Sequence, residues 1–120
     1  MKMPLPDEVT LSKRNEIIKS LQTIVPGEGV IIEKDELRAY DCDGLNAYKQ
    51  IPMIVVLPEN TQQVSEILRY CHEQNIKIVP RGAGTGLSGG ALPLADGITI
   101  GLGKFNKILN IDIPNRAIVA

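Results

Sequence analysis

The chain has 120 residues, 43% hydrophobic and 22% charged, which is the composition of one ordinary globular domain. Its formal net charge of −1 and its 3% content of aromatic residues argue against nucleic acid as a partner, because such proteins present a basic surface and stacking rings. The run from Met53 to Leu57 is far shorter than the ~20 apolar residues of a membrane span, and no signal-peptide pattern follows Met1. We therefore expect a cytoplasmic protein without a transmembrane segment, which does not exclude peripheral association with a membrane.

The first third of the chain is predicted to be mainly helical. Apolar residues recur with a helical period from Pro6 to Val25, and Pro26-Gly27 ends the pattern. Residues 30–32 favour a short strand, and residues 33–39 favour one or two helical turns. Residues 40–50 are predicted to be a loop that contains the turn signal Asp43-Gly44.

A strand, a helix and a second strand follow. The apolar run 53–57 does not alternate with polar residues, which is typical of a strand buried on both faces of a parallel sheet. Asn60 and Gln63 have the spacing of a capping box before an amphipathic helix over residues 61–74. Residues 76–79 are the second strand, which predicts a βαβ unit with two parallel strands and a right-handed crossover.

The last part of the chain is predicted to contain three further strands. Residues 98–101 favour a third strand, and residues 104–106 favour a turn. Residues 108–113 and 116–120 favour a hairpin joined through Pro114-Asn115. Because the chain stops inside this hairpin, we expect it to be a fragment of a longer protein.

A concentration of glycine in the segment Arg81-Gly-Ala-Gly-Thr-Gly-Leu-Ser-Gly-Gly-Ala91 is the feature that points to function. Glycines allow positive φ and close backbone approach, so several successive N–H groups can be directed at one anion. Each hydrogen bond to a charged phosphate oxygen contributes roughly 1.5–3 kcal/mol, so three or four can hold a diphosphate. Thr85 and Ser88 could add hydroxyl donors, and Arg81 could either add charge or brace the loop.

Other interpretations of this segment are weaker. Gly84, Gly86 and Gly89 match the dinucleotide fingerprint by letter, but residues 90–97 are too short and broken for the helix that the fingerprint requires. The Gly-Lys-Ser/Thr of a Walker loop is missing. A flexible surface loop would be more polar than one that carries Ala83, Leu87 and Ala91.

The glycine segment resembles the pyrophosphate-binding loop of FAD-linked oxidases of the vanillyl-alcohol-oxidase type, which have a PCMH-type FAD-binding domain. Within them it is most similar to the flavin subunits of glycolate oxidases and their D-lactate dehydrogenase relatives. The stretches Tyr40-Asp-Cys-Asp-Gly-Leu-Asn-Ala-Tyr48 and Val55-Val-Leu-Pro58 support the resemblance, which runs from about residue 8 to the end of the chain.

The resemblance implies an α/β (α+β) fold in which a small parallel βαβ sheet is flanked by helices and followed by the first strands of a second FAD-binding subdomain. The first subdomain would span about 8–90, and the second would begin over about 91–120. The residues carried over as contacts of the FAD diphosphate are Gly82, Ala83, Gly84, Thr85, Gly86, Gly90 and Ala91. Some relatives attach FAD covalently through a histidine near the place of Thr85, so this chain is expected to bind FAD non-covalently.

The implied activity is that of an oxidoreductase, in which a 2-hydroxy acid such as glycolate or D-lactate transfers a hydride to the flavin. Relatives run to several hundred residues, so the catalytic residues and the rest of the flavoenzyme lie outside this chain, and the chain alone is expected to be inactive. The resemblance is compatible with partner subunits, an iron–sulfur subunit among them. The alternatives are a stand-alone module that binds a nucleotide or phosphate, or an inactive truncated fragment whose strand edges associate.

The remaining polar residues do not indicate a second site. His72 follows Cys71 on the predicted helix, where neighbours point about 100° apart, so the two make a poor metal pair. His72 is expected to be a half-buried helix residue, and Cys42 and Cys71 are expected to be buried thiols. We predict no metal site, and we expect Gly84→Val to abolish FAD retention by blocking the approach of the backbone to phosphate.

Overall fold

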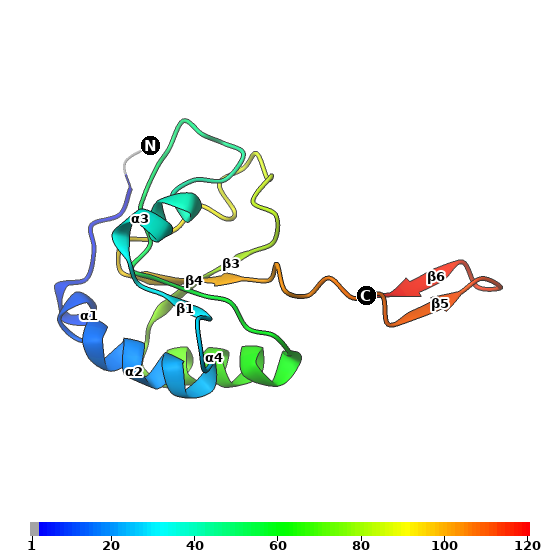
Figure 1. Cartoon of the computed structure of the whole chain (residues 1–120). Coiled ribbons are helices and arrows are strands. Elements are labelled where there is room, and N and C mark those ends of the chain that lie inside the picture. The colour runs from blue at the N-terminus through cyan, green and yellow to red at the C-terminus, as the bar shows by residue number, and fades with distance from the viewer. Residues whose placement is uncertain (1–2) are drawn as a thin grey trace.

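The computed structural model describes residues 3–120. Its centre is a four-stranded sheet that lies between a layer of helices and a layer of loops (Figure 1). Helices α2 and α4 cover one face of the sheet, whereas α3 and the long loops lie over the other. The elements in chain order are α1 (Glu8–Ser12), α2 (Arg14–Ile24), β1 (Val30–Ile31), α3 (Lys34–Leu37), the 3₁₀ helix η1 (Arg38–Tyr40), β2 (Ile54–Val56), α4 (Thr61–Glu73), β3 (Lys77–Arg81), β4 (Gly97–Gly101), β5 (Asn110–Asp112) and β6 (Ala117–Val119). Among the described residues, no helix is long and apolar enough to cross a membrane.

The strand order in the sheet is β1-β2-β4-β3. Strands β2, β4 and β3 are parallel, and β1 pairs with β2 in the antiparallel direction. The βαβ strands predicted from the sequence are therefore parallel, as expected, but β4 lies between them and pairs with both. The carboxyl ends of all three parallel strands consequently meet at one edge of the sheet.

The apolar core fills the space between the sheet and the two long helices. Ile98 and Ile100 of β4 face this side, and because side chains alternate along a strand, Thr99 faces the loops. The fully or almost fully buried members of the core include Ile17, Leu21, Val25, Ile54, Val56, Ile67, Cys71 and Ile98. Strand β2, Ile54–Val56, is thus buried on both faces, as the lack of alternation in the run 53–57 predicted, whereas Leu57 after it is partly exposed.

Helix α4 begins and ends where its sequence predicts. The side chain of Asn60 accepts a hydrogen bond of 2.9 Å from the N–H of Gln63. The side chain of Gln63 accepts one of 2.7 Å from the N–H of Glu59, so the capping residues bond in both directions. Asn75, with φ of 54°, reverses the chain after the last turn.

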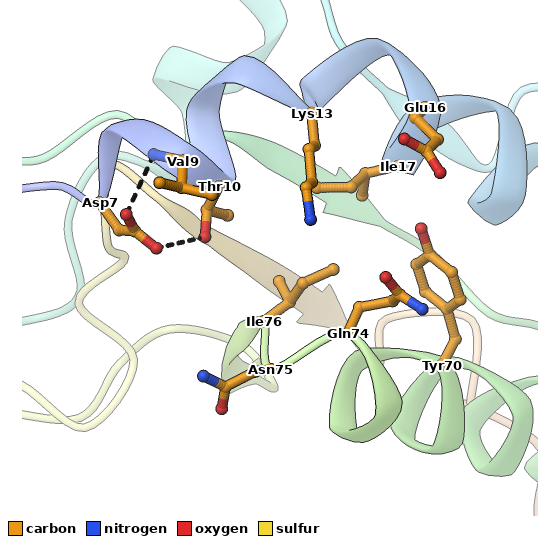
Figure 2. Close-up of a pocket in the computed structure, with 10 residues that line it drawn as sticks. All are labelled: Asp7, Val9, Thr10, Lys13, Glu16, Ile17, Tyr70, Gln74, Asn75 and Ile76. Carbon is orange, nitrogen blue, oxygen red and sulfur yellow. Dashed lines mark hydrogen bonds between the residues drawn. The ribbon is translucent and has the colours of Figure 1, made fainter.

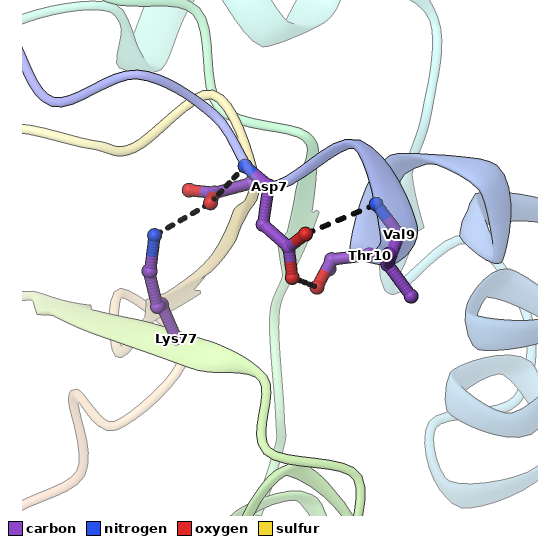
Figure 3. Close-up of polar contacts among 5 residues, drawn as sticks. Asp7, Val9, Thr10 and Lys77 are labelled. Atoms are coloured by element: carbon purple, nitrogen blue, oxygen red, sulfur yellow. Dashed lines mark hydrogen bonds and ion pairs between the residues drawn. The ribbon is translucent and has the colours of Figure 1, made fainter.

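The N-terminal helical pattern is interrupted, whereas a single helix was expected. Helix α1 ends at Ser12, Lys13 lies between the two helices, and α2 starts at Arg14, because the two segments are hydrogen-bonded to residues beside different strands. The guanidinium of Arg14 donates to the carbonyl oxygens of Ile32 at 2.8 Å and Met53 at 3.3 Å. Helix α1 is held at a different place: the backbone N–H of its N-cap, Asp7, donates to the carboxylate of Asp96 at 2.7 Å (Figure 3).

Asp96 also receives a hydrogen bond from the ammonium of Lys77 at 2.6 Å, which ties the start of β3 to the loop before β4. Burial raises the pKa of this carboxyl, but the Lys77 ammonium and the Asp7 N–H together lower it more, so its pKa lies below the usual value. A lowered folded-state pKa stabilises the fold above the unfolded-state pKa, and this stabilisation is lost as pH falls through the folded-state pKa.

We expect Asp96→Asn to lower the free energy of unfolding by about 1–3 kcal/mol at pH 7, because one buried acceptor and its charge are lost. The unsubstituted chain should lose stability between about pH 5 and pH 2, and the variant should lose less over that interval. Urea denaturation at several pH values measures both effects. The exposed ion-pair variant Asp35→Asn is the control, and an equal pH response in the Asp96→Asn chain would contradict the prediction.

The strands β5 and β6 form the predicted hairpin, with Ile111 opposite Ile118. The hairpin extends away from the four-stranded sheet at the end of the segment 102–109 (Figure 1). Its larger apolar side chains are exposed, with Ile113 at 80% and Ile118 at 64%. Strand β4 belongs to the first sheet although it lies after residue 90, so the four-stranded unit extends to Gly101.

Candidate functional site

The glycine loop, residues 82–91, starts where β3 ends, at the edge formed by the carboxyl ends of the parallel strands. A cleft of about 340 Å³ lies at this edge. Its lining residues are Ala39, Tyr40, Leu57, Arg81, Gly82, Ala83, Gly101, Gly103 and Lys104. Ligands of open parallel sheets bind in this position, since the loops that leave the strands converge there.

The glycine loop presents bare backbone to the solvent. In the part of the chain that the structure describes, no acceptor receives a hydrogen bond from the N–H groups of residues 82–91. A Cβ atom added at Gly82, Gly86 or Gly90 would have no atom within 4 Å, apart from its own chain neighbours. Unpaired N–H groups beside open space are the donors that a diphosphate needs, so these residues fit such a group.

Gly84 differs from these three glycines because it packs against another part of the chain. Its φ is +73°, and a Cβ atom at this position would collide with the guanidinium of Arg81. From the sequence, glycine is expected here because a side chain would block the approach of the backbone to phosphate. That expectation stays a prediction, and the folded chain supplies a second reason. Glycine is required at this position because the backbone is left-handed and rests on the Arg81 side chain.

Arg81 braces the loop. Its Nη1 atom donates a 2.6 Å hydrogen bond to the carbonyl oxygen of Cys42, and its Cζ atom lies 5.6 Å from the centre of the Tyr40 ring. The guanidinium therefore lies among Tyr40, Cys42 and Gly84. Of the two roles that the sequence left open for Arg81, bracing is the one for which the structure provides contacts.

The charge of the cleft favours an anion. Both charged lining residues, Arg81 and Lys104, are cations. The Lys104 ammonium is 2.6 Å from the carboxylate of Glu59, outside the cleft lining, and its hydrogen bond and charge lower the pKa of that carboxyl. Two cations beside unpaired backbone N–H groups can hold a diphosphate without a Walker lysine.

The residues predicted from the sequence occupy different positions in the site. Gly82 and Ala83 line the cleft, Thr85, Gly86 and Gly90 are exposed along the loop, and Ala91 is half-buried. Their contacts with a cofactor stay predictions. Tyr40, Leu57 and Lys104 were not predicted, although Leu57 and Lys104 follow the carboxyl ends of β2 and β4, which is the signal that could have identified them.

The histidine and the two cysteines lie outside the cleft lining. His72 is exposed rather than half-buried. Cys71 is buried, which raises the pKa of its thiol to about 11, and Cys42 is half-buried, with a pKa raised mainly by a hydrogen bond to Asp41. Neither thiol is thereby made a thiolate at neutral pH. Within residues 3–120, no group of three or more His, Cys, Asp or Glu side chains could hold a metal ion.

A smaller hollow of about 150 Å³ lies at the opposite edge of the sheet, between α1, α2 and the end of α4 (Figure 2). Lys13, Glu16, Tyr70 and Gln74 point into it. It is near the amino end of β3 and far along the strand from the glycine loop. It therefore does not belong to the candidate site.

Comparison with known proteins identifies the family to which the chain belongs. Residues 52–120 match the family described as "FAD binding domain". Glycolate oxidase subunit GlcD of Escherichia coli (strain K12) is 44% identical over 103 residues, which cover 86% of this chain and 21% of that protein. The mitochondrial D-2-hydroxyglutarate dehydrogenase of Arabidopsis thaliana is 35% identical over 118 residues, covering 92% of this chain and 21% of that protein.

Among solved structures, p-cresol methylhydroxylase with substrate bound is similar with a TM-score of 0.75 and 26% identity, over 90% of this chain and 22% of that chain. These findings confirm the resemblance and the fold class inferred from the sequence. The chain spans about a fifth of the length of the curated relatives named above, since 21% of each is covered.

Proposed function

Because the chain belongs to the FAD-binding domain family, we propose that it forms the part of a flavin site that binds the FAD diphosphate, in an oxidoreductase acting on a 2-hydroxy acid. The observation that carries this proposal is the row of unpaired N–H groups in residues 82–91, beside a cleft whose charged lining residues are cations. Relatives named for glycolate and D-2-hydroxyglutarate support the substrate class.

In this proposal the residues of the chain bind and orient the cofactor. Gly82, Ala83, Thr85 and Gly86 donate backbone N–H groups to the diphosphate, and Lys104 reduces its charge. When bound, the flavin supplies the redox chemistry by accepting a hydride from the hydroxy acid. Thr85 cannot attach the flavin as a histidine would, so FAD is held non-covalently.

The division into two subdomains and the assembly with partners also belong to the proposal. Strand β4 pairs within the first sheet, so we place the boundary after Gly101 rather than after residue 90. Residues 102–120 then begin the second subdomain. The substrate-binding residues belong to the rest of the flavoenzyme, which we place in the cytoplasm. A relative named as a subunit supports assembly with partner subunits.

Titration of the 15N-labelled chain with FAD, ADP and AMP tests the diphosphate proposal. We expect saturable shifts of the amide signals of residues 82–91 with FAD and ADP, which share a diphosphate. AMP has one phosphate and can engage fewer N–H groups, so its affinity should be about tenfold or more lower, a difference of ~1.4 kcal/mol. Equal affinity for AMP, or shifts confined to other residues, would contradict the proposal.

A second measurement distinguishes the proposed oxidoreductase from the alternative, a phosphate-binding module without a redox role. The oxidoreductase that carries this chain, loaded with FAD under anaerobic conditions, should lose its visible flavin absorbance when glycolate or D-lactate is added. L-lactate is the matched control. Binding of FAD without bleaching by any 2-hydroxy acid would support the module and overturn the proposed activity.

A further inference from the structure

Residues 41–50 form a closed loop beside the glycine loop (Figure 1). The N–H of Gln50 donates a 2.8 Å hydrogen bond to the carbonyl oxygen of Asp41, which joins the two ends. Inside the loop, the Asp43 carboxylate accepts a 2.9 Å hydrogen bond from the N–H of Leu45, and Asp43 is only 5% exposed. We call residues 41–50 the strap, since both its ends and its middle are held in place.

The strap contacts the glycine loop through Gly44. A Cβ atom added here would lie 2.6 Å from the carbonyl oxygen of Thr85 and 2.9 Å from that of Gly86, distances that real Cβ atoms do not adopt. The backbone of the strap therefore packs directly on that of the glycine loop. The atoms of the glycine loop nearest to Gly44 are the carbonyl oxygens of Thr85 and Gly86. The N–H groups of the same two peptide units, on Gly86 and Leu87, have no partner among the described residues.

Arg81 joins the strap to the glycine loop from the other side. Its guanidinium donates to the Cys42 carbonyl oxygen in the strap and lies against Gly84 in the glycine loop. It also lies over the Tyr40 ring, one residue before the strap. A planar guanidinium can make all three contacts at once, whereas a lysine ammonium has neither the flat face nor the fork of donors.

We propose that the strap holds the glycine loop in its diphosphate-binding conformation, with Arg81 as the positioning residue between them. This inference rests on the proposed function. A loop whose own N–H groups are unpaired has little internal structure to order it, and ordering it at the moment of binding would cost affinity. Contacts made before the ligand arrives remove that cost.

The test measures loop order and binding separately. 15N order parameters of residues 82–91 are measured without ligand, and the Kd for ADP is measured by amide shifts, in the unsubstituted chain, Arg81→Gln, Arg81→Lys and Gly44→Ala. Arg38→Gln is the matched control, because Arg38 is an exposed cation whose partner is Asp35. We expect order parameters near 0.85 in the unsubstituted chain and below about 0.6 in the two Arg81 variants and Gly44→Ala. Their Kd for ADP should rise about tenfold, with Arg38→Gln unchanged.

Unchanged order parameters in Arg81→Gln and Gly44→Ala would overturn the proposal, and so would lost order with an unchanged Kd. Recovery of affinity in Arg81→Lys would show that Arg81 acts through its charge rather than through position, which also overturns it. If the unsubstituted chain does not bind ADP at all, the proposed function fails. The ligand-free order parameters would then still decide whether the strap holds the loop.

Discussion

Gly82→Val is expected to raise the Kd of the chain for ADP by more than about 100-fold, or ~2.7 kcal/mol, the equivalent of one or two lost hydrogen bonds to a charged oxygen. Gly82 lines the cleft, and a Cβ atom there meets no other part of the chain, so the isopropyl group would occupy the space of the ligand. The φ of Gly82 is outside the left-handed region, so valine adds no strain there. The free energy of unfolding should stay within about 0.5 kcal/mol.

Isothermal titration with ADP and urea denaturation of the same samples measure the two quantities. Ala117→Val is the control, since it adds two methyl groups at an exposed position of β6, far along the chain from the cleft. It should change neither quantity. If Gly82→Val kept the affinity of the unsubstituted chain, the diphosphate would not lie against this part of the loop.

Gly84→Val is expected to lower both the free energy of unfolding and the affinity for ADP, unlike Gly82→Val. A β-branched residue with φ near +73° costs about 1–2 kcal/mol, and displacement of the Arg81 guanidinium adds to this, giving a total of roughly 2–3 kcal/mol. The βαβ core should stay folded, because the affected atoms lie outside the buried cluster. Urea denaturation and ADP titration measure the two losses.

A double-mutant cycle separates the strain from the collision. Gly84→Ala should cost less stability in an Arg81→Ala background than in the unsubstituted chain, because the guanidinium that the new Cβ would meet is gone. Additive costs would mean that backbone strain accounts for the whole effect. The contact between Gly84 and Arg81 would then have no energetic role.

Local patterns in the sequence determined most of the elements. The capping residues Asn60 and Gln63 fixed the start of α4, and the apolar run 53–57 predicted a doubly buried strand, because caps and burial patterns act over a few residues. The glycine segment likewise predicted a bare backbone loop after the second strand of the βαβ unit, and the N–H groups of that loop have no partner among residues 3–120.

Tertiary structure decided what depends on segments far apart in the chain. Pairing along the sheet placed β4 between β2 and β3, and hydrogen bonds to Ile32, Met53 and Asp96 divided the N-terminal helix at Lys13. The bracing role of Arg81 arises from a hydrogen bond to Cys42, 39 residues away. No short-range pattern encodes such a contact, because its partner is chosen by the way the whole sheet and its loops pack. The sequence alone therefore determined that residues 82–91 form the loop, and only the folded chain determined which of its glycines border open space and that Gly84 rests on Arg81.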